Sequence, residues 1–167
     1  MGKQRIIFCD IDGPVINTPM FYLDHNCSMG RTQMNTQALA YVVRLCKIAG
    51  AKLVTNSTHN THNLTDPLTG SVRTLKDDLV RWGVSPDHFH DHWRTDFPNY
   101  RGSRQYAIDK WIDDKDYDVD WVCFDDEKFT DSNRLIVIDY DRGIDYAAYR
   151  KAAKVWGFRD DPIWVGN

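Results

Sequence analysis

Short apolar runs recur along the chain, separated by segments with helical periodicity. The run from Arg5 to Cys9 (RIIFC) is continuous, as expected of a strand that is buried on both faces of a parallel sheet. Three further runs have the same character: residues 51–55 (AKLVT), 121–124 (WVCF) and 135–138 (LIVI). The hydrophobic pattern therefore predicts four strands of a parallel sheet.

Apolar residues at helical spacing predict four helices, over residues 36–49, 71–82, 104–113 and 144–156. Asn35 and Ser103 are the expected N-caps of the first and third helices, and Gly50 follows the end of the first. Strands that alternate with helices of this length favour right-handed crossovers, so we expect an α/β fold with a parallel sheet and helices on both faces. Ligands in such folds bind beyond the carboxyl ends of the strands.

Composition narrows the class of protein. The chain has 167 residues, with 21 Lys and Arg against 24 Asp and Glu and a net charge of −3. No repeat or linker divides it, so we expect a single domain over residues 1–167. No apolar run approaches the ~20 residues of a membrane span, and no secretion signal is recognisable. We therefore expect a cytoplasmic protein without a membrane partner, and the acidic balance disfavours bulk nucleic-acid binding.

Acidic side chains follow two of the predicted strands directly. Asp10 and Asp12 stand at the end of the first, before Gly13, and Asp125 and Asp126 stand at the end of the third. If these strands are neighbours, the carboxylates converge and repel one another unless a cation lies between them, and an all-oxygen site suits Mg²⁺. One carboxylate of the first pair can attack phosphorus while the other protonates the leaving oxygen. The alternative is that acids simply favour strand-to-loop junctions, which becomes weaker when two such pairs occur.

Three motifs in order resemble the haloacid dehalogenase-like (HAD) phosphohydrolase superfamily: FCDIDG, KLVTNS and WVCFDDE. The closing segment, residues 134–157, is similar to the last strand and helix of small HAD domains in bacterial and phage repair and nucleotide-processing proteins. The resemblance implies a three-layer Rossmann-like sheet. It also implies that residues 14–34 form a short flap in place of a full cap domain.

The resemblance also implies residue roles. Asp10 becomes the nucleophile that forms an aspartyl-phosphate, and Asp12 becomes the general acid and base. The expected Mg²⁺ ligands are Asp10, the Asp12 carbonyl, Asp125 and Asp126. Thr55 is expected to hydrogen-bond the phosphoryl group with help from the Asn56 N–H, and the expected phosphate-binding set also includes Gly13, Ser57 and Arg101.

The third HAD motif departs from the family pattern, which places a Lys near the start of the helix before the last acidic strand. The basic candidates here are Arg104 and then Arg101, because Lys110 lies two turns into the predicted helix. An arginine can bridge a carboxylate and a phosphate through its planar fork. Both arginines could equally be solvated surface residues.

Several other features leave alternatives open. His88, His90 and His92 would share one face of a strand, where they form either a zinc-binding pair or, more commonly, a polar edge. His59 and His62 follow Thr55 in a loop at the active edge, where they either contact substrate or are simply exposed. Phe21 and Tyr22 in the flap either stack on a nucleobase or pack against the body.

The sequence favours an Mg²⁺-dependent phosphomonoesterase of the HAD type. The preferred partner is a phosphorylated small molecule, above all a nucleotide, and a nucleic-acid terminal phosphate is the other candidate. Two alternatives stay open: a HAD-shaped module that binds a phosphorylated ligand without turnover, and a phosphatase subunit of an end-repair assembly. The sequence leaves homo-oligomerisation undecided.

Overall fold

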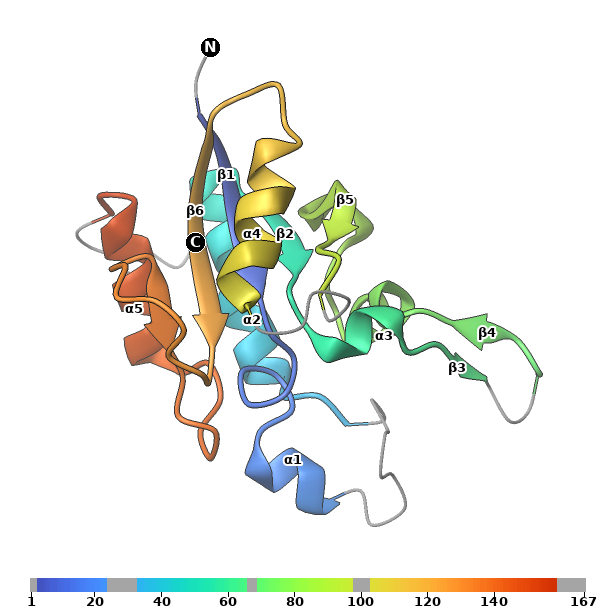
Figure 1. Cartoon of the computed structure of the whole chain (residues 1–167). Coiled ribbons are helices and arrows are strands. Elements are labelled where there is room, and N and C mark those ends of the chain that lie inside the picture. Colours follow the sequence, from blue (N-terminus) through green and yellow to red (C-terminus); the bar gives the residue numbers. More distant parts are fainter. Residues whose placement is uncertain (1–2, 24–32, 66–68, 98–102, 159–167) are drawn as a thin grey trace, which may run out of the picture.

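The central sheet of this computed structural model is parallel, and β1 is its middle strand. The structure describes residues 3–23, 33–65, 69–97 and 103–158. Within these residues the sheet has the order β5-β2-β1-β6-β7. Its strands are β1 (Gln4–Cys9), β2 (Lys52–Thr55), β5 (Phe89–Arg94), β6 (Val119–Asp125) and β7 (Leu135–Val137). The α/β class with a parallel sheet is therefore confirmed (Figure 1).

The strand register brings the predicted motifs to one edge. Cys9 of β1 pairs with Thr55 of β2 on one side and with Phe124 of β6 on the other. The residues that follow Cys9 and Phe124 are Asp10 and Asp125, so both acidic motifs leave the sheet side by side. The expectation that the first and third predicted strands are neighbours is confirmed.

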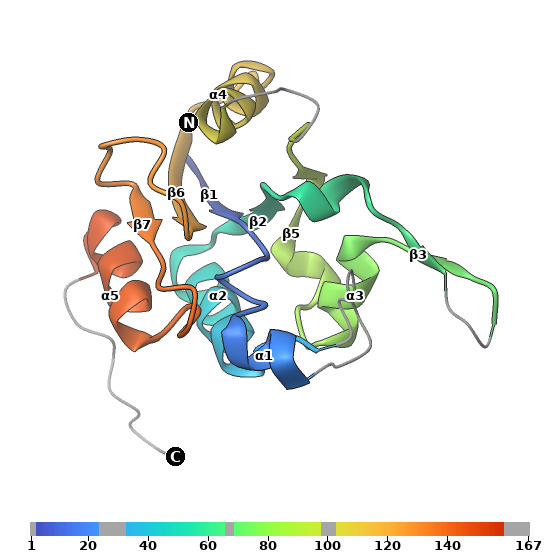
Figure 2. The same ribbon diagram turned by 60° about the horizontal axis from the view of Figure 1, so that its bottom comes forward.

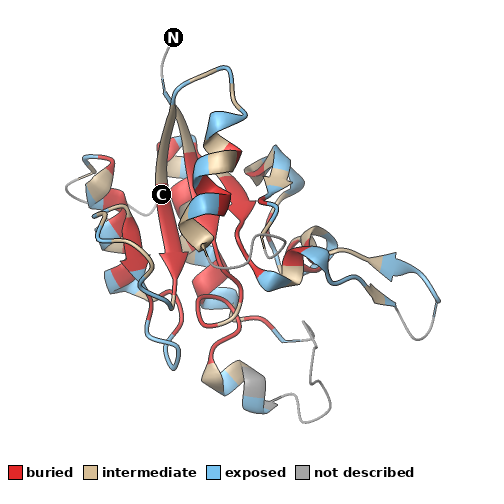
Figure 3. Ribbon diagram, viewed as in Figure 1, coloured by how far each residue is buried: buried red, intermediate tan, exposed pale blue. Residues whose placement is uncertain are grey.

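Helices cover both faces of the sheet. The helices α2 (Thr36–Ala49), α3 (Leu75–Arg81) and α5 (Tyr146–Val155) pack on one face, and α4 (Arg104–Asp113) packs on the other (Figures 1 and 2). Alternation along β1 explains this, because Ile7 faces the larger core while Ile6 and Phe8 face the core under α4. The central strands are buried on both sides (Figure 3), which accounts for their unbroken apolar sequence.

The helix boundaries follow local capping chemistry. The bounds of α2 and α4 are as predicted, and Asn35 and Ser103 accept hydrogen bonds from the first turns as N-caps. The prediction of a helix over residues 71–82 was wrong in its first turn. The helix starts at Leu75, because Thr74 is its N-cap and forms a capping box with Asp77. Likewise α5 starts two residues later than predicted, because Asp145 caps it.

Two segments extend from the core. α1 (Thr18–Leu23) lies beyond the carboxyl ends of β1 and β6, inside the segment predicted as a flap (Figure 1). Tyr22 there is 66% exposed, and the Phe21 side chain lies outside the described residues. The antiparallel pair β3 (Leu64–Thr65) and β4 (Val72–Arg73) projects beyond α3, to the right in Figure 1, and the sequence pattern did not predict it. No helix in the described part of the chain is long and apolar enough to cross a membrane.

Candidate active site

Three carboxylates converge where β1 and β6 end. One oxygen each of Asp10, Asp125 and Asp126 lies within 4.8 Å of the others. Asp10 and Asp125 are almost completely buried, and Asp126 is partly exposed. The parallel register fixes this arrangement, because it carries both strand ends to the same level of the sheet.

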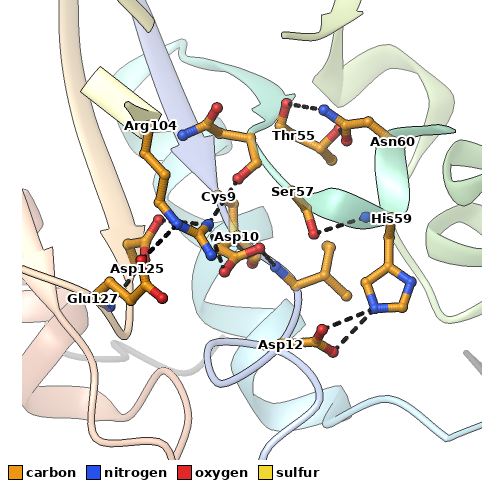
Figure 4. A network of polar contacts seen from close by, with 12 residues as sticks. Cys9, Asp10, Asp12, Thr55, Ser57, His59, Asn60, Arg104, Asp125 and Glu127 are labelled. Carbon is orange, nitrogen blue, oxygen red and sulfur yellow. Dashed lines mark hydrogen bonds and ion pairs between the residues drawn. The ribbon is translucent and has the colours of Figure 1, made fainter. Parts of the chain in front are cut away.

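Asp10 lies in the centre of the site (Figure 4). Its Oδ1 accepts a hydrogen bond from the Ile11 N–H (2.7 Å), and its Oδ2 lies 2.8 Å from Nη1 of Arg104. Burial raises the pKa of Asp10 to about 6, although the Arg104 charge and a hydrogen bond from the Ser57 hydroxyl act in the opposite direction. Despite the ion pair, Oδ2 is a buried atom with no well-aligned hydrogen bond from the described residues. It therefore keeps a lone pair for another ligand.

Asp125 carries the second buried charge. Its Oδ1 accepts the Glu127 N–H (2.9 Å), and its Oδ2 lies 3.1 Å from Arg104 Nη1. Burial, and then repulsion from Asp10, raise the pKa of Asp125 to about 7. Burial also raises the pKa of Asp126. All three carboxyls thus resist ionisation together, as expected where negative charge is concentrated without a counter-ion of sufficient charge.

Arg104 is the cation of the site and the first residue of α4. Its Nη1 contacts Asp10 and Asp125 and donates to the Asn56 carbonyl oxygen (3.3 Å), while its Nε lies 3.2 Å from Glu127. The guanidinium also lies 5.0 Å from the centre of the Phe97 ring, which leaves it well shielded from water. Of the basic candidates, Arg104 is therefore in place, whereas Arg101 lies outside the described residues. Lys110 lines a separate small groove two turns further along the helix.

Asp12 points away from the buried cluster, toward a residue that the sequence pattern left undecided. Both of its carboxylate oxygens lie 3.1 Å from Nε2 of His59 (Figure 4). His59 belongs to the 3₁₀ turn Thr58–Thr61 that follows β2. Its position just past a strand end at the active edge was the available sequence signal, but the path of the turn decided which way its ring faces.

The two hydroxyls near the end of β2 have different surroundings. The Thr55 hydroxyl donates to Oδ1 of Asn60 (2.6 Å), and Asn60 in turn donates to the backbone oxygens of Thr55 and Thr95. The Ser57 hydroxyl, by contrast, accepts the backbone N–H of His59 (3.3 Å) and lies close enough to Asp10 to lower the pKa of that carboxyl. The Thr55 hydroxyl is therefore bonded within the scaffold, and Ser57 is the hydroxyl that lies beside the carboxylates.

The backbone N–H of Asn56 is already hydrogen-bonded, whereas its side-chain amide keeps a donor that is unpaired among the described residues. Its backbone N–H donates to the Cys9 carbonyl (2.9 Å) and continues the ladder between β1 and β2. Its Oδ1 accepts from the Thr95 hydroxyl (2.8 Å), while its fully buried Nδ2 has no hydrogen-bond partner among the described residues. The backbone N–H that was expected to bind the phosphoryl group is thus used within the sheet. The side-chain Nδ2 is the donor that remains available.

Gly13 allows the turn after Asp12. It has a φ of +86°, and a Cβ at this position would lie 2.8 Å from Cβ of Asp126 and 3.1 Å from the Tyr140 ring. A side chain here would therefore displace Asp126 in addition to straining the backbone. The glycine shapes the site sterically.

The donor set fits a hard divalent cation. The converging groups are all carboxylates, their pKa values are raised, and the buried Oδ2 of Asp10 lacks a well-aligned hydrogen bond. Oxygen ligands with excess negative charge suit Mg²⁺. The Asp12 carboxylate is not in this group, so Asp12 contributes at most its backbone carbonyl.

The histidine run on β5 has a structural environment. His88 lies in the 3₁₀ turn Pro86–His88, so two of the three histidines lie on the edge strand itself. His90 Nε2 lies 2.7 Å from the Tyr117 hydroxyl, and His92 Nδ1 lies 3.0 Å from Lys115 Nζ. The metal-ligand grouping found in the described residues does not include them. The polar edge-strand interpretation fits these contacts.

A parallel α/β sheet with carboxylates clustered at its carboxyl edge is the arrangement of a HAD-like domain. The family model for the HAD domain in Swiss Army Knife RNA repair proteins matches residues 6–148, and the chain belongs to this family. Membership indicates a HAD function of the phosphatase type. Neither the curated proteins nor the solved structures that were searched contain a match to the chain.

Proposed function

We propose that the protein is an Mg²⁺-dependent phosphomonoesterase that works through an aspartyl-phosphate on Asp10. The observation that carries this proposal is the convergence of Asp10, Asp125 and Asp126 within 4.8 Å, with Arg104 against two of them. Such a site gathers a nucleophile, ligands for a cation and a fixed positive charge at one point.

The chain's own residues account for both halves of the reaction. A carboxylate oxygen of Asp10 bonds to phosphorus as the bond to the leaving oxygen breaks, and Asp12 gives its proton to that oxygen. Water then attacks phosphorus, Asp12 takes the water proton, and the Asp10–phosphorus bond breaks to restore the free carboxylate.

Arg104, Ser57 and the Nδ2 of Asn56 are the donors available to the phosphoryl oxygens. Asp10, Asp125, Asp126 and the Asp12 carbonyl would hold the Mg²⁺ ion. The bound cation would offset the charge of the phosphoryl group and of the carboxylates around it.

The proposed substrate is a nucleotide or the terminal phosphate of a nucleic acid. The family description, which names RNA repair proteins, supports a phosphate carried by a nucleoside. Tyr140 is 41% exposed and lies against the Gly13 turn beside Asp12, where the organic part of a leaving group would lie. We further propose that residues 14–34, which include α1, act as a short flap on a single domain.

The test is phosphate release from p-nitrophenyl phosphate and from panels of nucleoside monophosphates, phosphorylated oligonucleotides and sugar phosphates. We expect turnover that requires Mg²⁺ and disappears in Asp10→Asn. Wild-type protein that binds nucleotides without turnover would instead support a binding module. Sugar phosphates that react far faster than nucleotides would overturn the proposed substrate class.

A further inference from the structure

His59 is the hydrogen-bond partner of the Asp12 carboxylate. Its Nε2 lies 3.1 Å from both Oδ1 and Oδ2, so a single ring nitrogen is shared between the two oxygens (Figure 4). The two side chains differ in exposure, 12% for His59 and 45% for Asp12. A half-exposed carboxylate on a glycine turn is thus held by a well-buried ring.

The ring itself is supported by the sheet. The backbone N–H of His59 donates to the hydroxyl of Ser57 (3.3 Å), which is the N-cap of the 3₁₀ turn. Asn60, the next residue, is 2% exposed and bonds to Thr55 and Thr95 at the ends of adjoining strands. The Arg94 guanidinium also donates to the Asn60 carbonyl (2.7 Å). Since the turn is bonded on several sides, the backbone that carries the ring has a fixed place relative to β2 and β5.

The chemistry of the pair sets the direction of the hydrogen bond. An ionised carboxylate only accepts, so Nε2 must carry the proton when Asp12 is ionised. When Asp12 is protonated, one oxygen holds the proton that goes to the leaving group, while the other still accepts from His59. The His59 proton stays on the ring throughout, so the ring orients the carboxylate without entering the proton balance.

We propose that His59 is a positioning residue that aims the Asp12 carboxyl at the leaving oxygen and later at the attacking water. This inference rests on the proposed function, because it assigns a role within that reaction. The two catalytic carboxylates thus have different partners. Arg104 contacts Asp10 in the buried cluster, and His59 contacts Asp12 outside it.

The distinguishing experiment varies the leaving group. p-Nitrophenolate leaves without protonation, whereas the alkoxide of a nucleoside monophosphate needs the proton from Asp12. In His59→Ala we expect kcat for a nucleoside monophosphate to fall by about 10- to 100-fold with KM within about twofold. In the same variant, single-turnover release of p-nitrophenol should stay within about threefold of wild type.

Two variants keep the result interpretable. His59→Gln places an amide N–H near the position of Nε2 and should recover most of the lost kcat. His92→Ala removes an exposed histidine from the edge strand β5, which does not contact His59, and should match wild type. Thermal unfolding of each variant shows whether the fold is kept.

The outcomes separate this inference from the proposed function. Equal losses with both leaving groups, or full activity in His59→Ala, would overturn the role of His59 while leaving the phosphatase intact. A His59→Gln variant that folds normally yet matches His59→Ala would also overturn it. A wild-type protein without any phosphatase activity would instead overturn the proposed function itself.

Discussion

Arg104 balances the charge of two buried carboxylates, and its Nη1 lies against both of them. We expect Arg104→Ala to lower kcat by at least about 100-fold, because a transition-state cation is lost. Arg104→Lys keeps the charge but loses the second nitrogen, Nε, that lies against Glu127, so a loss of about tenfold is expected. Steady-state kinetics with saturating Mg²⁺ measure both. Lysine and alanine variants with the same activity would contradict this role.

Burial of the ionised Asp10 carboxylate lowers the stability of the metal-free folded protein. Its folded pKa of about 6 lies above the ordinary value of 3.8, so folding favours the protonated carboxyl. The stabilisation from the protonated group is complete below pH ~4 and is lost as the pH rises through about 6. Asp10→Asn mimics the neutral acid, and in metal-free protein it should therefore raise the Tm at pH 7.5 and leave it nearly unchanged at pH 4.

Calorimetric scans at the two pH values test this. The Asn side chain can keep the hydrogen bond from Ile11, so the substitution isolates the charge. A metal-free variant that is less stable than wild type at pH 7.5 would show that the ion pair with Arg104 outweighs desolvation.

The sequence predicted the positions of some side chains at the strand ends but not the contacts of others. Asp10, Asp125 and Asp126 follow apolar strands directly, so the fold class places them together. The contacts of Thr55, Ser57 and His59 depend on the path of a 3₁₀ turn after β2, and that turn is set by the buried Asn60. No periodicity encodes such a path, because it arises from side-chain hydrogen bonds between distant strands.

At the level of elements, helix starts decide where functional side chains lie. Ser103 caps α4 immediately before Arg104, and Thr74 caps α3 away from the carboxylate cluster. Replacing either cap with alanine should cost about 1 kcal/mol of stability. We expect Ser103→Ala also to lower kcat, because fraying of the first turn moves Arg104, whereas Thr74→Ala should keep wild-type kcat. Urea unfolding and steady-state kinetics on both variants check the pair, and equal kcat values would contradict the coupling.

Periodicity predicted α2, α4 and four of the five strands of the central sheet, but it did not predict β5 or the two-residue strands β3 and β4. The bounds of α2 and α4 could be derived because apolar faces and N-caps agree. The predicted helix over residues 71–82 included Val72 and Arg73, which instead form β4. Strands of two residues carry no period, and the pairing of β3 with β4 comes from backbone hydrogen bonds across a hairpin.

For the whole molecule, the sheet explains why negative charge accumulates at one edge. Parallel strands buried on both faces leave their carboxyl ends as the place where polar groups can gather. The metal-free protein holds three carboxyls with raised pKa values there. Cation binding should therefore be coupled to proton release and to overall stability.

Thermal unfolding with Mg²⁺ and with EDTA tests this coupling. We expect Mg²⁺ to raise the Tm more at pH 7.5 than at pH 5.5, because protons compete for carboxyls with pKa values of about 6 and 7. Asp125→Asn should lose most of the shift at both pH values. Equal shifts at the two pH values, or an unchanged shift in Asp125→Asn, would place the cation elsewhere.

The most direct test of the central claim is to trap the phosphorylated nucleophile. The protein is mixed with substrate and Mg²⁺, quenched during turnover and reduced with borohydride, which converts an acyl phosphate of aspartate into homoserine. Mass spectrometry of the peptide that contains Asp10 should then show homoserine at this position, dependent on substrate and absent without Mg²⁺. Substrate turnover with an unmodified Asp10, or homoserine at another aspartate, would contradict the account.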